Sequence, residues 1–185
     1  ASYPALGVWC TRREFVADVF PVDHPAHAHG IVLRSKCDTT FSILYSGDCR
    51  PTPCLIQRGI AYGPLKILVH EATFDDGLQQ EAKAKSHSTT GEAMAVAAAC
   101  GAKHLILTHF SQRYPKLPPP SASANASASQ VFQESTAQPQ VMFSFDYMTI
   151  PLDTESLRIL PGLTGTFLAL LAEYDSWESG TSKRM

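Results

Sequence analysis

Two short apolar segments, separated by two helical patterns, constrain the fold of this chain more than any other feature. The segments Leu65–Val69 and Leu105–Thr108 have the length and composition of buried β-strands. Between them, acidic residues precede a helical pattern over 78–85, and a second helical pattern covers 90–100. This β-α-α-β alternation predicts an α/β domain with helices packed on a face of the sheet.

Further elements extend this pattern in both directions. Thr89 and Glu92 have the spacing of a capping box for the second helix, and Gly101 is a typical helix stop. The segment 118–140, rich in Pro, Ser and Ala, lacks large apolar residues and is expected to be a flexible surface insertion. We also predict strands over 15–22, 31–34, 41–45 and 141–148, a short helical turn from 51 towards 59, and a last helix over 164–176.

Polar residues capable of binding metal follow several of these predicted strands. Asp48 comes after the strand 41–45, His70 and Glu71 end the strand that begins at Leu65, and His109 follows Thr108. Such strand ends are a common support for catalytic groups, so we expect one active-site rim. Imidazole and carboxylate groups suit zinc.

Three residues, His24, Asp48 and His109, are therefore the metal-ligand candidates. The pair His27 and His29 resembles a metal-binding His-x-His sequence. However, Gly30 and Ile31 occupy the positions where the Asp-His of a dinuclear hydrolase motif would follow. The pair is therefore a weaker candidate than the other three.

The segment from His87 to Thr90 precedes the second predicted helix and suggests an anion site. The first turn of a helix presents free N–H groups, which attract an anion such as phosphate, and Ser88 and Thr89 add hydroxyl donors. A histidine at such a site can donate a proton to a leaving oxygen, and Glu71 could orient it. The alternative is that Ser88 or Thr89 is a plain helix cap, Glu71 a surface carboxylate and His70 a hydrogen-bonded core histidine.

Composition limits the remaining possibilities. The 185 residues are sufficient for about one domain, and a net charge of −2 gives no broad basic surface for nucleic acid. Five unevenly spaced cysteines favour reduced thiols in an intracellular protein over a disulfide framework. The longest apolar stretch, 163–172, is too short to cross a bilayer, and no signal-peptide pattern precedes residue 18. Because the chain begins with Ala1, we expect it to be part of a longer protein.

Four blocks of residues together resemble the signature of a known family, tRNase Z. This is the zinc-dependent endoribonuclease that removes the 3′ trailer from precursor tRNA on a metallo-β-lactamase fold. The Phe-Ser-Gln-Arg-Tyr sequence at 110–114 and the helix start at 74–78 are more similar to the catalytic, C-terminal half of the long eukaryotic form. The blocks are Ser46–Pro51, His70–Thr73, His87–Thr89 and Thr108–Tyr114, with Phe145–Met148 similar to a strand near the end of these enzymes.

The resemblance implies a role for each matched residue. His24 and His109 would each bind one of two zinc ions, and Asp48 would bridge them. His87 and Glu71 would be the proton-donor pair. The resemblance also implies precursor tRNA as partner, no membrane association, and a nuclear or mitochondrial location. Residues in or beside the matched blocks are the expected substrate contacts: His70, Thr73, Ser88, Thr89 and Arg113.

One motif of the family is missing from these 185 residues, namely His-x-His-x-Asp-His, which supplies most of the metal ligands. The expected fold is therefore α/β, the C-terminal part of a metallo-β-lactamase αββα sandwich. The parts would be a partial domain over 1–117, the insertion 118–140, and a closing strand and helix of the same domain over 141–185.

We accordingly expect the two-zinc site to be partial or empty in this chain and the chain to be inactive alone. It would need the missing N-terminal portion as a partner, and its uncovered faces would favour homo-oligomers. Two other functions stay open at this point. One is another metallo-β-lactamase phosphodiesterase, acting on cyclic nucleotides or lipids, and the other is a non-catalytic binding or scaffold fragment.

Overall fold

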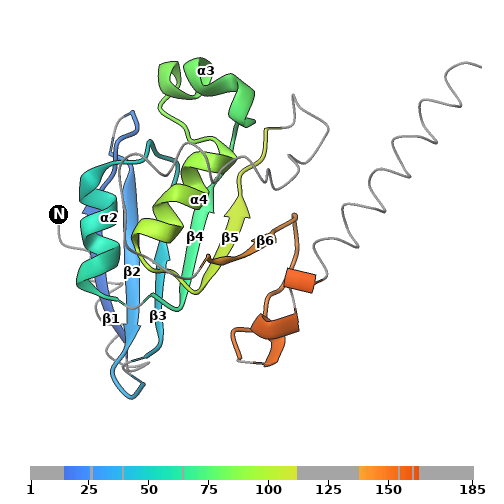
Figure 1. Cartoon of the computed structure of the whole chain (residues 1–185). Coiled ribbons are helices and arrows are strands. Elements are labelled where there is room, and N and C mark those ends of the chain that lie inside the picture. Colours follow the sequence, from blue (N-terminus) through green and yellow to red (C-terminus); the bar gives the residue numbers. More distant parts are fainter. Residues whose placement is uncertain are drawn as a thin grey trace, which may run out of the picture.

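The computed structural model describes residues 15–25, 27–38, 40–63, 65–111, 138–153, 155–159 and 161–162, and contains one six-stranded sheet. The strand order follows the sequence, from β1 at one edge to β6 at the other (Figure 1). The strands are β1 (Phe15–Pro21), β2 (His29–Ser35), β3 (Ser42–Tyr45), β4 (Ile67–Glu71), β5 (His104–Thr108) and β6 (Gln140–Phe143).

The sheet is mixed, because its two halves are connected in different ways. β1, β2 and β3 pair antiparallel, whereas β3, β4, β5 and β6 pair parallel. Parallel neighbours need crossover connections: α2 (Pro53–Ala61) joins β3 to β4, and α3 (Gln79–Ala84) with α4 (Thr90–Ala99) joins β4 to β5. Because successive crossovers are right-handed and advance in one direction, α2 and α4 lie on the same face of the sheet (Figure 1).

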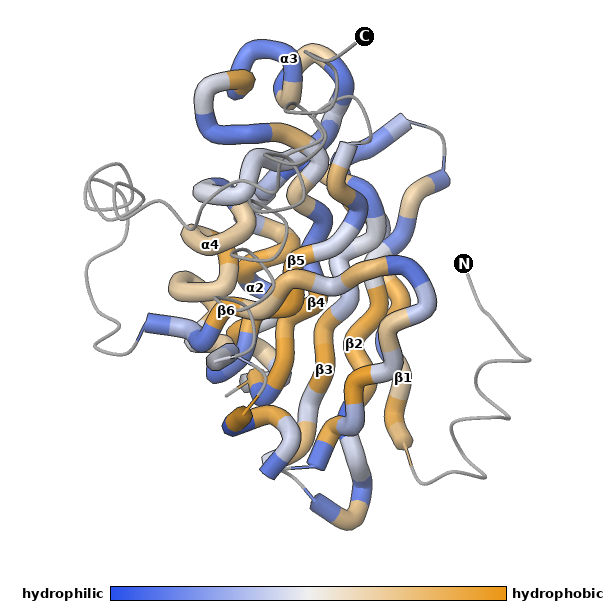
Figure 2. Tube along the Cα trace, turned by 90° about the vertical axis from the view of Figure 1, so that its right-hand side faces the viewer, coloured by the Kyte–Doolittle hydropathy of each residue, from blue (hydrophilic) through white to orange (hydrophobic). Residues whose placement is uncertain are grey.

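The main core lies between these helices and the sheet. α2 packs against β2 and α4, while α4 packs against β4 and β5. Alternate residues of a strand face opposite sides, so Leu68 and Leu105 point into this core and Ile67 and Ile106 point to the other face. There a smaller cluster includes Leu157. In Figure 2 the strands are mostly orange, as expected for the core, and α3 is mostly blue. This agrees with the position of α3 at the periphery of the fold.

The predicted β-α-α-β unit is present, with local signals where they were expected. Thr89 and Glu92 form a complete capping box at the start of α4, and Gly101 after its end has a φ of 65°. A 3-10 turn, η1 (Asp76–Leu78), precedes α3. The strands β4 and β5 are displaced by one or two residues from the predicted ranges.

Two elements differ from prediction. The expected short turn after Pro51 is a nine-residue helix, α2, with Pro53 in its first turn and Thr52 as a cap that accepts a hydrogen bond from the Leu55 amide at 3.2 Å. The strand expected over 141–148 ends at Phe143, and a turn follows, in which the Met148 amide donates to the Phe145 carbonyl at 3.0 Å and Tyr147 has a φ of 64°.

Several predictions concern residues outside the described ranges: the helix 164–176, most of the insertion 118–140, and Arg113. Four of the five cysteines lie in the described part of the chain, and all four are free thiols: Cys37, Cys49, Cys54 and Cys100. Among the residues that the structure describes, no helix is both long and apolar enough to cross a membrane.

Candidate active site

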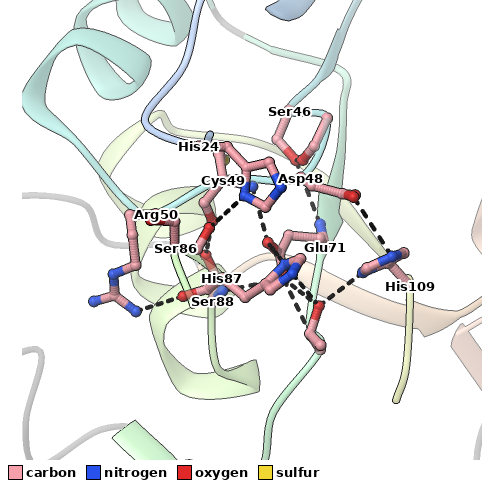
Figure 3. A network of polar contacts seen from close by, with 12 residues as sticks. His24, Ser46, Asp48, Cys49, Arg50, Glu71, Ser86, His87, Ser88 and His109 are labelled. Atoms are coloured by element: carbon pink, nitrogen blue, oxygen red, sulfur yellow. Dashed lines mark hydrogen bonds and ion pairs between the residues drawn. The ribbon is translucent and has the colours of Figure 1, made fainter. Parts of the chain in front are cut away.

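The polar residues at the ends of three parallel strands lie close together, as the sequence predicted. Asp48 is in the loop after β3, Glu71 is the last residue of β4, and His109 directly follows β5 (Figure 3). Because β3, β4 and β5 are parallel, their carboxyl ends share one edge of the sheet. The loop before α4 adds His87 to the same place.

Three of these residues form a group that could hold a metal ion. One ligand atom from each of Asp48, His87 and His109 lies within 4.8 Å of the other two. His109 Nε2 is 3.5 Å from Asp48 Oδ2, and the backbone of His109 is left-handed, with a φ of 60°. A non-glycine residue in this region is uncommon and is often found at functional sites.

His24, the third predicted ligand, lies beside this group and is not one of its three members. Its ring centroid is 4.7 Å from that of His87. His24 Nδ1 is 2.8 Å from the Ser86 carbonyl oxygen. A carbonyl only accepts, so Nδ1 carries the proton, and Nε2 of the neutral ring keeps its lone pair for a metal.

Glu71 is buried behind these side chains and accepts hydrogen bonds through both carboxylate oxygens. Oε1 accepts from the Cys49 amide and from His87 Nδ1, each at 2.8 Å. Oε2 accepts from the Ser88 amide at 3.0 Å and from the Thr73 hydroxyl and amide at 2.7 and 3.2 Å. Burial raises the pKa of Glu71, but these hydrogen bonds from Thr73, Ser88, His87 and Cys49 outweigh it and hold the pKa below its ordinary value.

The contact expected between His87 and Glu71 is therefore present, and it fixes the proton of His87. Since Glu71 is held as a carboxylate, it accepts from Nδ1, and Nε2 of His87 is directed away from it. The ring of His87 stacks on that of His109 with centroids 5.3 Å apart. His87 can thus offer Nε2 either to a metal or, when protonated, to a leaving oxygen.

Three of the five residues expected to contact substrate are instead buried. His70, Ser88 and Thr89 have 0% exposed surface, because each makes hydrogen bonds inside the protein. His70 Nδ1 bonds to the Glu71 carbonyl, Ser88 Oγ donates to the Cys49 carbonyl at 2.6 Å, and the Thr89 hydroxyl caps α4. Burial also lowers the pKa of His70, so its ring is neutral.

Arg50 was not given a role by the sequence analysis, although it lies in one of the matched blocks. Its guanidinium forms a two-pronged ion pair with Glu92 and also donates to the His87 carbonyl at 2.7 Å. The Arg50 amide donates to the Asp23 carbonyl at 2.9 Å. Arg50 therefore ties the His24 segment, the His87 loop and the start of α4 together. Glu92 is remote in sequence, so no local signal could have found this contact.

The donor set and its spacing fit zinc. Two ligands at about 2.1 Å from one tetrahedral ion lie roughly 3.4 Å apart, close to the 3.5 Å between His109 Nε2 and Asp48 Oδ2. Imidazoles anchored through their second nitrogen are typical of zinc sites. His29 Nδ1 contacts the His27 carbonyl at 2.7 Å, and neither histidine belongs to the group formed by the described residues.

Several known proteins are similar to this chain in sequence. The chain is 36% identical over 162 residues to the mitochondrial tRNase Z TRZ3 of Arabidopsis thaliana, covering 83% of this chain and 16% of that protein. It is 35% identical over 158 residues to the zinc phosphodiesterase ELAC protein 2 of Rattus norvegicus, covering 85% of this chain and 17% of that protein.

A solved structure is also similar. The crystal structure of a long form RNase Z from yeast superimposes with a TM-score of 0.65 and 29% identity, over 89% of this chain and 21% of that one. The chain thus spans about a fifth or less of the length of these proteins. Residues 15–110 match the beta-lactamase superfamily domain. Because this match covers more than half of the chain, and the similar proteins are of the tRNase Z type, the chain belongs to the metallo-β-lactamase superfamily.

Proposed function

We propose that this chain is part of a zinc-dependent endoribonuclease of the tRNase Z type, which removes the 3′ trailer from precursor tRNA. The observation that carries the proposal is the grouping of Asp48, His87 and His109 in front of the buried carboxylate of Glu71. The names of the similar proteins, tRNase Z and zinc phosphodiesterase, supply the reaction and the substrate class.

In this proposal His24, Asp48 and His109 are the residues that hold zinc. When bound, zinc supplies an activated water and offsets negative charge at the phosphate. Each of the three residues has a suitable donor: a carboxylate oxygen of Asp48, and Nε2 of His24 and of His109, whose Nδ1 atoms contact Ser86 O and Thr73 Oγ1.

His87 is the proposed proton donor. Glu71 accepts the Nδ1–H of His87, which leaves Nε2 as the site of the transferable proton. As the bond between phosphorus and the leaving oxygen breaks, the proton passes from Nε2 to that oxygen, and the neutral imidazole remains bonded to Glu71. Arg50 holds the backbone of His87 through its carbonyl during this step.

The remaining ligands and the carboxylate that takes the proton of water are proposed to come from a portion outside these 185 residues. The chain contains no His-x-His-x-Asp-His sequence, and the similar proteins are several times longer. We propose that 1–117 and 141–185 belong to one domain interrupted by 118–140. The pairing of β6 with β5 supports this division. A mitochondrial location is proposed from the relatives named as mitochondrial.

The test is cleavage of a precursor tRNA. We expect the purified chain to leave a precursor tRNA uncut, and the protein that also contains the upstream portion to cut it in the presence of zinc. In that longer protein, the exposed-site variant Arg158→Gln is the control, since Arg158 pairs only with Glu155 at the surface among described residues. Zinc-dependent cleavage by the 185 residues alone would contradict the proposal that their metal site is incomplete. Failure of the longer protein to cut any tRNA precursor would contradict the function.

A further inference from the structure

We propose that Thr73 is a positioning residue, whose hydroxyl transmits the orienting effect of Glu71 to His109. One buried carboxylate would then fix the protons of two imidazoles, His87 directly and His109 through Thr73. This inference rests on the proposed role of His109 as a metal ligand, and it replaces the expectation that Thr73 contacts substrate.

The hydroxyl of Thr73 lies between the two groups. Its Oγ1 is 2.7 Å from Glu71 Oε2 and 2.7 Å from His109 Nδ1. A hydroxyl has one proton to donate. Oε2 of Glu71 already accepts from the amides of Ser88 and Thr73, so it is an acceptor towards the hydroxyl as well.

The proton assignments follow from this arrangement. The Thr73 hydroxyl donates its proton to Glu71, so its oxygen can only accept from His109, and Nδ1 of His109 carries the proton. His87 Nδ1 is also near this oxygen, at 3.3 Å, but its shorter contact is with Glu71 Oε1 at 2.8 Å. The neutral ring of His109 therefore presents the lone pair of Nε2 towards Asp48, 3.5 Å away.

The backbone holds Thr73 in this position. The Ala72 amide donates to the Thr108 carbonyl at 2.8 Å, and the Ser111 amide donates to the Thr73 carbonyl at 3.3 Å. These two bonds attach the segment after β4 to the residues on both sides of His109. The hydroxyl and the imidazole are thus set against each other by the parallel pairing of β4 and β5.

The experiment measures which nitrogen of His109 carries the proton. The chain is prepared with ¹⁵N-labelled histidine, without metal, at a pH above the ordinary histidine pKa of about 6.5, and the ring nitrogens are observed by NMR. We expect a protonated Nδ1 and an unprotonated Nε2 for His109 in the wild-type chain and in Thr73→Ser. Thr73→Val is expected to shift His109 to a mixture of the two forms.

The control is Thr40→Val. Thr40 has the same local arrangement as Thr73, because its hydroxyl donates at 2.6 Å to a carboxylate two residues earlier, that of Asp38. It lies in an exposed turn, so its replacement should leave the His109 signals unchanged. A second readout is zinc affinity in the protein with the upstream portion, where Thr73→Val should weaken binding about 10- to 100-fold and Thr73→Ser should not.

Each result decides the inference separately from the proposed function. A wild-type His109 protonated on Nε2 overturns it without any variant, and so does a Thr73→Val protein whose His109 is unchanged. If Thr73→Val does not fold, Thr73→Ala removes the hydroxyl without adding bulk and is judged in the same way. If the expected shifts occur but the protein with the upstream portion cuts no precursor tRNA, the positioning role stands and the proposed function is wrong.

Discussion

Replacing Glu71 by glutamine should destabilise the domain, although the two side chains have nearly the same shape. Glu71 is 1% exposed and accepts five hydrogen bonds, three of them from backbone amides. An amide group has one oxygen and one NH₂, so one of the two positions becomes a donor that faces other donors.

The size of this loss of stability follows from the less costly of the two orientations that the glutamine amide can adopt. With the NH₂ at the Oε2 position, the amides of Ser88 and Thr73 both lose their acceptor. With the NH₂ at the Oε1 position, only the Cys49 amide loses its acceptor, since His87 Nδ1 can become an acceptor for the NH₂. One unsatisfied buried N–H costs about 1–3 kcal/mol, and the remaining bonds lose their charge assistance. We expect a total loss of about 2–4 kcal/mol at neutral pH.

Urea denaturation at several pH values measures this loss. With an m-value of about 2 kcal/mol/M, the midpoint should fall by roughly 1–2 M. Because the pKa of Glu71 is lowered in the folded state, its contribution is complete above the ordinary value of 4.5 and is lost as the pH falls through the folded pKa. The difference between wild type and Glu71→Gln should therefore narrow below pH 4.5.

Glu155→Gln is the matched control. Glu155 pairs with Arg158 on the surface, so its replacement should change stability by less than about 0.5 kcal/mol. Equal midpoints for wild type and Glu71→Gln at neutral pH would refute the reasoning, as would a difference that stays constant into the acid range.

Three further predictions concern the site. In the protein that also contains the upstream portion, His87→Ala should lower the proposed cleavage rate about 100-fold or more while zinc content, measured by metal analysis, stays the same; loss of zinc would make His87 a ligand instead. Asp48→Asn should weaken zinc binding more than about tenfold in a calorimetric titration, and unchanged affinity would exclude Asp48 as a ligand. Arg50→Met should cost about 1–3 kcal/mol in thermal unfolding because it leaves Glu92 without its partner, whereas Arg50→Lys, which keeps the charge, should cost less; equal melting temperatures would contradict this.

The elements predicted best are those specified by neighbouring residues. The capping box needs only Thr89 and Glu92, and the helix stop needs only Gly101, so both could be read from the sequence. The closeness of Asp48 and His109 was predictable because the carboxyl ends of parallel strands in one sheet meet at the same edge, although β4 lies between β3 and β5. The extent of β6 was not, since Phe145–Met148 has strand-forming side chains but turns away from β5 at Tyr147.

Part of the polar interior of the site could not be predicted, and the reason is physical. His70, Ser88 and Thr89 have polar side chains and were expected to be accessible, but their partners bury them completely. His70 and Thr89 bond to residues near them in sequence, Glu71 and Glu92, and their burial was among the alternatives that the sequence left open. Ser88 instead bonds to the Cys49 carbonyl, 39 positions away, and residue type and local spacing contain no information about such a partner.

The sequential strand order has a consequence for biosynthesis. As the chain leaves the ribosome, each new strand of the sheet can pair with the one made just before it, so the sheet can grow from β1 outward. Asp48 is then in place before β5 exists, and His109 reaches it only after β5 has paired with β4. A nascent chain therefore exposes the β4 edge while the candidate metal site is half built, and binding of the proposed zinc should come late in maturation.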